Sequence, residues 1–285
     1  MTPHIIAIEW DTDQILARFV RYLIAGTGWS VSTKPDPRAD VNVFMPYLCW
    51  AQYPEFQQGH LAAWFTHRET VWPAKALMWD NAEHDAGLRL ACAKMYVDEL
   101  AKHGPAAQVT APLERDKFFI MPDSGIRKAR PRIGFSGYVY KTGRKGEKNV
   151  ARLVAERPKW QVIASGKGWP CECGEWTWHT VQRFYQSLDV YVCSATVEGL
   201  PMPPLEALAC GCKVVIPSGV GLLDEIPAAP GIVRYTCGDY GQMLQAIEIA
   251  LDTDADPEEL RATTAQYSPE RFASDFVEAI NAMGW

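Results

Sequence analysis

The chain has 285 residues, of which 48% are hydrophobic, and its 28 basic and 34 acidic side chains give a formal net charge of −6. This length suits two domains of ordinary size, each with an apolar core. The acidic balance argues against a broad, non-specific nucleic-acid binder, because such proteins present excess positive charge to phosphates. The first residues do not read as a signal peptide and no apolar run is long enough to cross a bilayer, which predicts a cytoplasmic protein.

The first part of the chain alternates between apolar strand-like runs and amphipathic segments. Strands are predicted over residues 4–9, 29–32, 41–45, 61–67, 88–93 and 108–113. Helices are predicted over 15–24, capped by Thr12 or Asp13, and over 94–103. The alternation is typical of an α/β domain with a parallel sheet. His67 ends one of these strands, where such sheets bind ligands, although an ordinary loop histidine is nearly as plausible.

Pro122, Gly125 and clustered charge within residues 116–129 predict a linker between two domains. The predicted boundaries are 1–122, 123–267 and a terminal helix over 268–285. In the second domain, strands are predicted over 132–139, 160–166, 188–193, 213–217 and 232–235, and helices over 147–156, 180–187, 205–210, 240–251 and 257–266. Eight basic residues and one acid lie between residues 127 and 148. This run is either a solvated face or, since its later cations and the glycines among them follow a strand, a diphosphate site.

The stretch SATVEGLPMPPLEALACGC, residues 194–212, lies between two of these strands. Its prolines suit a helix start and Gly211 suits a helix end, so a helix amino terminus should lie at the carboxyl edge of the sheet. Two carboxylates flank the turn, Glu198 in the loop and Glu206 in the first helical turn. Carboxylates accept hydrogen bonds from paired hydroxyls, which suits sugars. Taken alone, Glu206 could equally be a helix-capping residue and Glu198 a solvated charge.

The string EGLPMPPLEALACG, with seven residues between its two glutamates, resembles the donor-site motif of the retaining glycosyltransferases of the GT-B fold, GT4 type (glycosyl transferases group 1). The resemblance is dense over residues 190–226, thinner over 132–189 and weak before that. It implies an α/β fold with two Rossmann-like domains that face a cleft, and a carboxyl-terminal helix that crosses back to the first domain. It also implies that the nucleotide-sugar is held mainly by the second domain.

The resemblance also assigns roles to individual residues. Glu198 would contact the donor sugar, Glu206 the ribose hydroxyls, and Lys145, with Arg144, the leaving diphosphate; His67 would reach the sugar. The other donor-binding positions that it implies are Gly137, Gly166, Ser194, Gly199 and Leu200. The chain departs from the family at Leu200-Pro201, where an aromatic residue and a glycine are usual, at Tyr138, where the family has an arginine, and in the turn over residues 10–13, which lacks glycine.

The resemblance implies transfer from a UDP- or GDP-sugar with retention of configuration, with no cofactor and no obligatory metal. The acceptor stays open among polysaccharide, lipid carrier, protein and modified DNA base, and the small first domain favours a large one. A non-catalytic nucleotide-sugar-binding module and a GT-B-fold sugar-nucleotide epimerase are the alternatives.

Two weaker patterns could bind metal. Cys171 and Cys173 with His179 lack a fourth ligand and match no common zinc spacing, and the 8 cysteines fit reduced thiols better than disulfides. Asp-x-Asp occurs over residues 11–13 and 252–254, but capping and surface roles explain such pairs as well.

Overall fold

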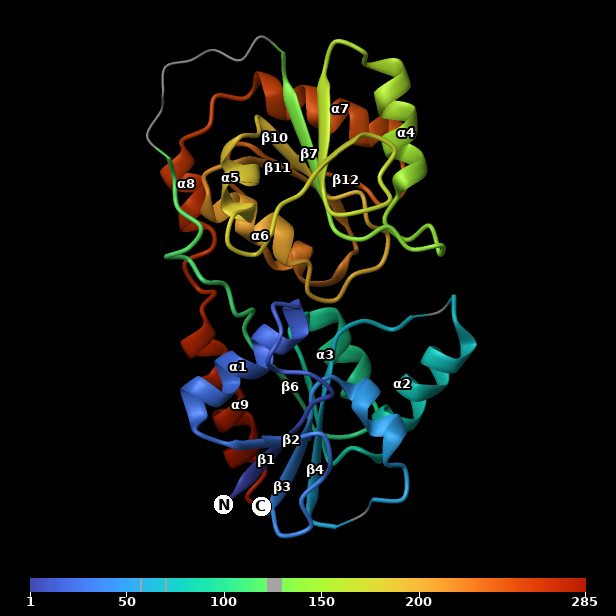
Figure 1. Ribbon diagram of the computed structural model, residues 1–285, viewed down its shortest axis with the longest axis vertical. Coiled ribbons are helices and arrows are strands. Elements are labelled where there is room, and N and C mark those ends of the chain that lie inside the picture. The colour runs from blue at the N-terminus through green and yellow to red at the C-terminus, as the bar shows by residue number, and fades with distance from the viewer. Residues whose placement is uncertain (57, 70, 122–129) are drawn as a thin grey trace. The chain divides into compact units, whose positions relative to one another are not determined.

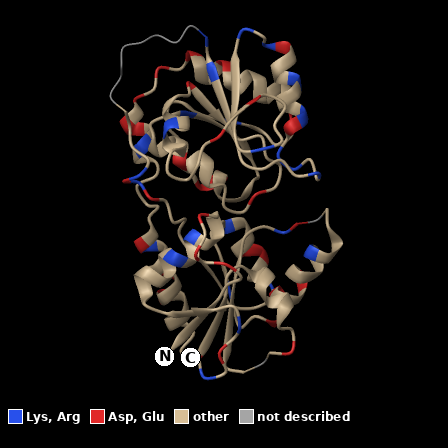
Figure 2. Cartoon of the chain, viewed as in Figure 1, with Lys and Arg blue, Asp and Glu red and all other residues tan. Residues whose placement is uncertain are grey.

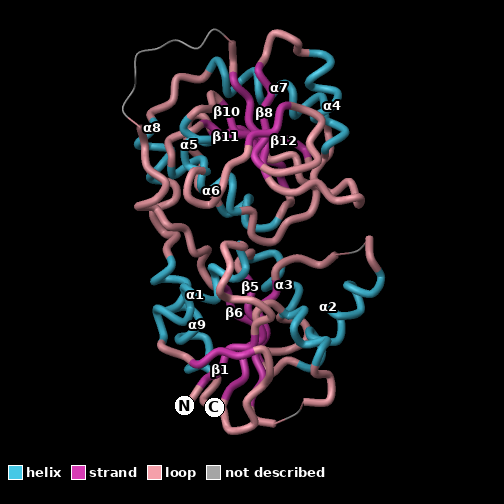
Figure 3. Tube along the Cα trace, viewed as in Figure 1, coloured by secondary structure: helices cyan, strands magenta, loops and turns pink. Residues whose placement is uncertain are grey.

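The computed structural model describes residues 1–56, 58–69, 71–121 and 130–285. The chain forms two compact units (Figure 1): unit 1 is Met1–Pro112 with Gln266–Trp285, and unit 2 is Leu113–Ala265. The predicted boundary at 122/123, with Pro122 and Gly125, lies outside the described residues. Figure 3 shows the strands of each unit gathered in one sheet with helices on either side.

Unit 1 is built on a six-stranded parallel sheet in the order β2-β1-β3-β4-β5-β6. Its strands are β1 Pro3–Ile6, β2 Ser30–Ser32, β3 Val41–Phe44, β4 His60–Phe65, β5 Leu88–Ala91 and β6 Ala106–Gln108. Its helices are α1 Ile15–Thr27, α2 Pro73–Asp85, α3 Lys94–Leu100 and α9 Pro269–Ala282, with a short 3₁₀ helix over Tyr47–Gln52.

Three predictions for unit 1 are wrong in detail. The last strand is β6, which ends at Gln108, where the predicted strand begins. Strand β4 ends at Phe65, so His67 lies in the loop beyond it. Helix α1 has Gln14 at its N-cap with no side-chain capping bond, so neither Thr12 nor Asp13 caps it.

The carboxyl-terminal helix α9 packs against α1 in unit 1, as predicted for this fold. A methyl group added at Gly26 of α1 would lie 2.4 Å from the Ala273 Cβ atom, so the absent side chain permits the close approach. Asp275 of α9 accepts a hydrogen bond from the Thr110 amide at 2.7 Å. After the helix, the ring of Trp285 stacks on His60 with centroids 4.6 Å apart.

Unit 2 is a second six-stranded parallel sheet, in the order β12-β11-β10-β7-β8-β9. Its strands are β7 Arg132–Ser136, β8 Gln161–Ser165, β9 Glu172–Gly174, β10 Val190–Val192, β11 Lys213–Ser218 and β12 Ile232–Thr236. Its helices are α4 Glu147–Glu156, α5 Val181–Gln186, α6 Met202–Ala209, α7 Tyr240–Asp252 and α8 Pro257–Ala262, with a 3₁₀ helix over Gly221–Glu225.

Both sheets are mostly apolar, because helices cover the strands on both faces. In Figure 2 the strands are largely uncharged, and most charged residues lie on helices and loops. The core of unit 2 includes side chains from the sheet, such as Phe135 and Val192, and from α7, such as Met243 and Ile247. Within the described residues, no helix combines the length and apolar character needed to cross a membrane.

Candidate functional site

The candidate site lies where the strand order of unit 2 reverses. From β7 the chain runs through α4 to β8 on one side, and from β10 it runs through α6 to β11 on the other. Strands β7 and β10 are neighbours, so the loops after them leave the sheet side by side. In parallel sheets, ligands bind at this switch point, outside the carboxyl ends of the strands.

The loops after β7 and β10 bring two cations and a carboxylate together. The Lys145 ammonium is paired with Glu198 Oε1, 53 residues away in sequence, and Arg144 Nη1 lies 3.9 Å from the same oxygen. All three side chains are largely buried, with 12–16% of their surface exposed. Low exposure makes these charges interact more strongly than surface pairs.

The other described cations of the basic run point elsewhere. Lys141, Lys148 and Arg130 are exposed, and Arg132 Nε donates to Gln161 at 3.0 Å. Arg127 and Lys128 lie outside the described residues. The run is therefore mixed: Arg144 and Lys145 belong to the site, and the exposed residues form the solvated face.

Ser194 fixes the backbone that carries the two cations. Its hydroxyl donates to the Lys145 carbonyl oxygen at 2.6 Å, and the Thr196 amide donates to the Arg144 carbonyl oxygen at 2.8 Å. Gly146, at φ 70°, directly follows the two cations in the chain, and a methyl group there would come within 2.2 Å of the Ser194 carbonyl oxygen. Only glycine permits both this left-handed conformation and this approach.

Gly137 and Gly166 form a second part of the same edge. The Gly137 amide donates to the Ser165 carbonyl oxygen at 2.9 Å, and the Gly137 carbonyl oxygen accepts from Trp169 Nε1 at 2.8 Å. A methyl group at Gly166 would lie 2.2 Å from that same carbonyl oxygen. The loops after β7 and β8 are thus held together through backbone atoms and one indole.

The loop that carries Glu198, Gly199 and Leu200 rests on the turn after β11. The Leu222 amide donates to the Gly199 carbonyl oxygen at 3.2 Å, and a methyl group at Gly221 would lie 2.3 Å from the Glu198 carbonyl oxygen. Gly199 is buried and Leu200 is half-buried. Gly221 was not among the predicted site residues, although two glycines, Gly219 and Gly221, closely follow β11 in the sequence.

Glu206 is placed differently from the prediction. Helix α6 begins at Met202, so Glu206 is its fifth residue and not in the first turn, and the N-cap is Pro201. The Glu206 side chain is 5% exposed, and its Oε2 atom accepts a hydrogen bond from the Tyr185 hydroxyl at 2.6 Å. The capping interpretation of Glu206 is therefore wrong, and the carboxylate is part of the interior of unit 2.

The amino terminus of α6 offers few donors to an anion. Pro201, Pro203 and Pro204 have no amide hydrogen, so Met202 alone supplies one among these four positions. Proline suits the start of a helix, but here it removes the groups through which helix termini bind phosphate. The positive charge of the site therefore comes from Lys145 and Arg144.

His67 belongs to unit 1. It follows β4 by two residues, is half-buried, and its carbonyl oxygen accepts a bond from the Tyr47 hydroxyl at 3.4 Å. The structure does not group it with the residues of unit 2, and its role in contacting the sugar stays a prediction.

The two patterns considered for metal binding lie in different parts of the chain, the first in unit 2 and the second in both units. Cys171 is half-buried and Cys173 lies on the edge strand β9, and all cysteines of the described chain are free thiols. Asp13 lies 3.9 Å from Arg21 on α1. Across the described residues, no group of three or more His, Cys, Asp or Glu side chains is arranged to hold a metal ion.

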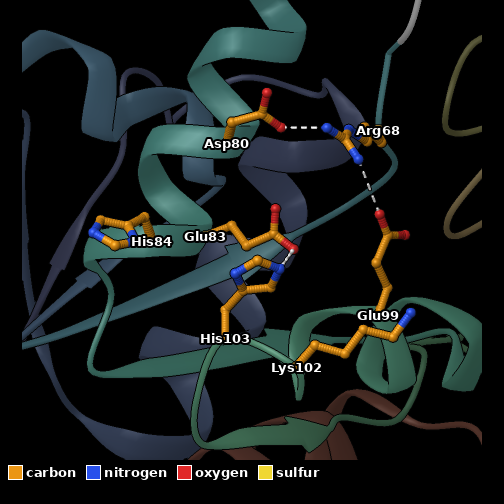
Figure 4. Close-up of a pocket in the computed structure, with 7 residues that line it drawn as sticks. All are labelled: Arg68, Asp80, Glu83, His84, Glu99, Lys102 and His103. Carbon is orange, nitrogen blue, oxygen red and sulfur yellow. Dashed lines mark hydrogen bonds and ion pairs between the residues drawn. The ribbon is translucent and has the colours of Figure 1, made fainter.

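A polar pocket of about 420 Å³ lies between α2 and α3 in unit 1 (Figure 4). Arg68 bridges Asp80 at 2.5 Å and Glu99 at 3.2 Å, and His103 Nε2 lies 3.3 Å from Glu83 Oε1. Burial raises the pKa of Glu83, partly offset by His103. These ion pairs join α2 to α3 and to the segment after it, so most of the charges that line the pocket are paired with one another.

Residues 173–271 match the family model described as Glycosyl transferases group 1. A search of curated protein sequences gives no match. Among solved structures, sucrose-phosphate synthase from Thermosynechococcus elongatus is 14% identical with a TM-score of 0.78, over 100% of this chain and 99% of that one. Anabaena Alr3699/HepE in complex with UDP and glucose is 10% identical with a TM-score of 0.76, over 99% and 100%. The lipopolysaccharide outer core galactosyltransferase WaaB is 12% identical with a TM-score of 0.72, over 99% and 100%.

These likenesses extend over nearly the whole of each chain, and the identities are low enough that they concern the fold. The family match covers β9 to the start of α9 and includes Glu198 with its loop and Glu206 with helix α6. The chain therefore has the α/β fold with two parallel-sheet, Rossmann-like domains found in the GT-B glycosyltransferases, and its residues 173–271 match the Glycosyl transferases group 1 family.

Proposed function

We propose that this protein is a glycosyltransferase that moves a sugar from a nucleoside-diphosphate sugar to a large acceptor, with retention of configuration. The observation that carries the proposal is the convergence of Lys145, Arg144 and Glu198 at the switch point of unit 2. The family match over residues 173–271 supports the same activity, and one solved neighbour was described in complex with UDP and glucose.

We assign the charges of the proposed reaction to residues of this site. When the bond between the sugar and the diphosphate breaks, negative charge develops on the diphosphate. Lys145 and Arg144 stabilise that charge, since fixed cations in a poorly hydrated site act strongly and need no reorganisation. Lys145, which pairs with Glu198 in this structure, exchanges that partner for the diphosphate, and Glu198 then accepts hydrogen bonds from the sugar hydroxyls. Because the cations neutralise the diphosphate, we propose that no metal is required.

The remaining site residues position the donor. Glu206 accepts hydrogen bonds from the ribose hydroxyls, and the glycine loops at Gly137 and Gly166 allow backbone atoms to approach the nucleotide. We see no dedicated general base among the residues of the site; the departing phosphate would take the acceptor's proton.

A binding panel followed by an activity assay tests the proposal. UDP- and GDP-sugars should raise the melting temperature of the protein, because a ligand that binds only the native state stabilises it. Slow hydrolysis or transfer from one of these donors should then be measurable. Binding without any turnover would favour the alternative of a non-catalytic nucleotide-sugar-binding module, and release of an epimerised sugar would favour a sugar-nucleotide epimerase. Absence of binding to every donor would overturn the proposal.

A further inference from the structure

We propose that Tyr185 is a positioning residue that orients the Glu206 carboxylate toward the ribose of the donor. The inference rests on the proposed function, since it takes Glu206 as the ribose contact. Tyr185 lies on α5, outside the motif that contains the two glutamates, and it is not itself placed against the donor.

The contact between the two side chains is short and buried. The Tyr185 hydroxyl donates to Glu206 Oε2 at 2.6 Å, and the two residues are 1% and 5% exposed. Hydrogen bonds to a charged acceptor are shorter and stronger than those between neutral groups, and a buried carboxylate depends on them because water does not solvate it. The bond therefore fixes one oxygen of Glu206 in space.

The Tyr185 ring is itself held firmly. It packs edge-on against Phe118, Phe184 and Tyr191, with ring centroids 5.3–6.0 Å apart. The Tyr191 hydroxyl lies 2.9 Å from Ser136 Oγ, at the end of β7. The orientation of Glu206 is thus tied to the two strands that form the switch point.

The proton of this hydrogen bond belongs to Tyr185. Burial, and then the charge of Glu206, raise the pKa of Tyr185 well above its ordinary value near 10. Tyr185 therefore keeps its hydroxyl proton and donates it to Glu206 Oε2. Two neighbouring ribose hydroxyls are donors, and an oriented carboxylate that only accepts is complementary to them.

Two probes separate a positioning role from a general structural one. The first is whichever of UDP and GDP the wild type binds more tightly, and the second is the 2′,3′-dideoxy analogue of that nucleotide. Tyr185→Phe should weaken binding of the first by about tenfold, the loss expected for a hydrogen bond to a charged group. It should leave binding of the analogue unchanged, since the analogue lacks the hydroxyls that Glu206 would bind.

A matched control removes the hydroxyl group of a different buried tyrosine. The Tyr235 hydroxyl donates to the Cys193 carbonyl oxygen at 2.9 Å, and Tyr235 is 4% exposed. Tyr235→Phe should leave the affinity for both probes within about threefold of wild type, because Glu206 keeps its donor. A double variant closes the test: adding Tyr185→Phe to Glu206→Ala should cause no further loss of affinity.

The outcomes are distinguishable. Equal loss for both probes in Tyr185→Phe, or a further loss in the double variant, would mean that Tyr185 acts through general stability, and unchanged binding would mean that it does not position Glu206; either overturns the inference alone. If the wild type binds neither nucleotide, the proposed function fails and the inference fails with it. If Tyr185→Phe does not fold, the wild type and Glu206→Ala still decide: equal wild-type affinity for a nucleotide and its dideoxy analogue would overturn the inference.

Discussion

Lys145 and Glu198 form an ion pair in this structure, and this pairing predicts the effect of removing the lysine. Removing Lys145 leaves Glu198 beside Arg144, whose Nη1 is 3.9 Å from Glu198 Oε1, so the fold should survive while the diphosphate loses one of its two proposed cations. Lys145→Ala should lower turnover with a nucleotide-sugar by about 100-fold or more. Lys148→Ala, which removes an exposed lysine three residues further on, should have little effect. Similar small losses in both variants would mean that the basic run is only a solvated face.

Variants of the two glutamates, Glu198 and Glu206, should have different effects on nucleotide binding. Glu206→Ala should weaken binding of both the nucleoside diphosphate and the nucleotide-sugar, whereas Glu198→Ala should leave nucleoside diphosphate binding nearly intact and abolish transfer. The reason is that we place Glu206 on the ribose and Glu198 on the sugar. Titration calorimetry measures the first effect, and melting of the unliganded variants controls for lost stability. Wild-type binding and transfer in both variants would refute the donor-site assignment.

The loop between β7 and α4 packs against the segment that follows strand β10. Gly146→Ala should displace this loop, because the added methyl group would lie 2.2 Å from the Ser194 carbonyl oxygen. Gly143→Ala is the matched control: its φ of 74° imposes similar backbone strain, but the nearest atom, Glu147 Oε1, would be 3.7 Å away. We expect nucleoside diphosphate affinity to fall strongly in the first variant only. Equal affinities would show that this packing does not shape the site.

The contacts around α2 predict unequal roles for two arginines. Arg89 is 2% exposed and donates to the carbonyl oxygens of Glu83 and His84, at 2.6 and 3.2 Å. Arg89→Met should cost on the order of 2 kcal/mol or more, because buried carbonyl groups lose their donors. Arg68, 38% exposed, bridges Asp80 and Glu99, and Arg68→Met should cost about 1 kcal/mol or less. Urea denaturation measures both, and an equal cost would contradict this ranking.

Helix α2 is an element that could not be predicted from the sequence. Its apolar side chains do not share one face: Trp79 is fully buried, whereas Leu77, two residues earlier, is 60% exposed. Without a clear helical period the segment gave no prediction. Strand β9 is only three residues long and contains Cys173, so it was considered only as a possible metal site. The longer strands β4, β7 and β11 have apolar, buried residues at their centres and were predictable, because parallel strands are buried on both faces.

At the scale of the whole molecule, sequence analysis predicted the two-domain α/β fold and the return of the terminal helix to the first domain, and both are confirmed. The spacing of Glu198 and Glu206 indicated where a site should lie. It could not indicate that Glu198 pairs with Lys145, since 53 residues separate them in the chain. They meet because they lie on the loops after the neighbouring strands β7 and β10. Nor could it indicate Tyr185, which carries no motif and reaches Glu206 only through the packing of α5 on α6.

The leaving diphosphate should not require a metal ion. If Lys145 and Arg144 neutralise the leaving diphosphate, donor hydrolysis or transfer should persist at an unchanged rate in excess EDTA, because the fixed cations supply the charge that a divalent ion supplies elsewhere. The assay should compare wild type with Lys145→Ala, each with EDTA and with added manganese or magnesium. Wild type should respond to neither addition. A loss of wild-type activity that manganese or magnesium restores would contradict metal independence and would direct attention to Asp11 and Asp13, whose spacing is that of a diphosphate-metal motif. Rescue confined to Lys145→Ala would instead support the proposal, since a divalent ion would then replace the missing charge.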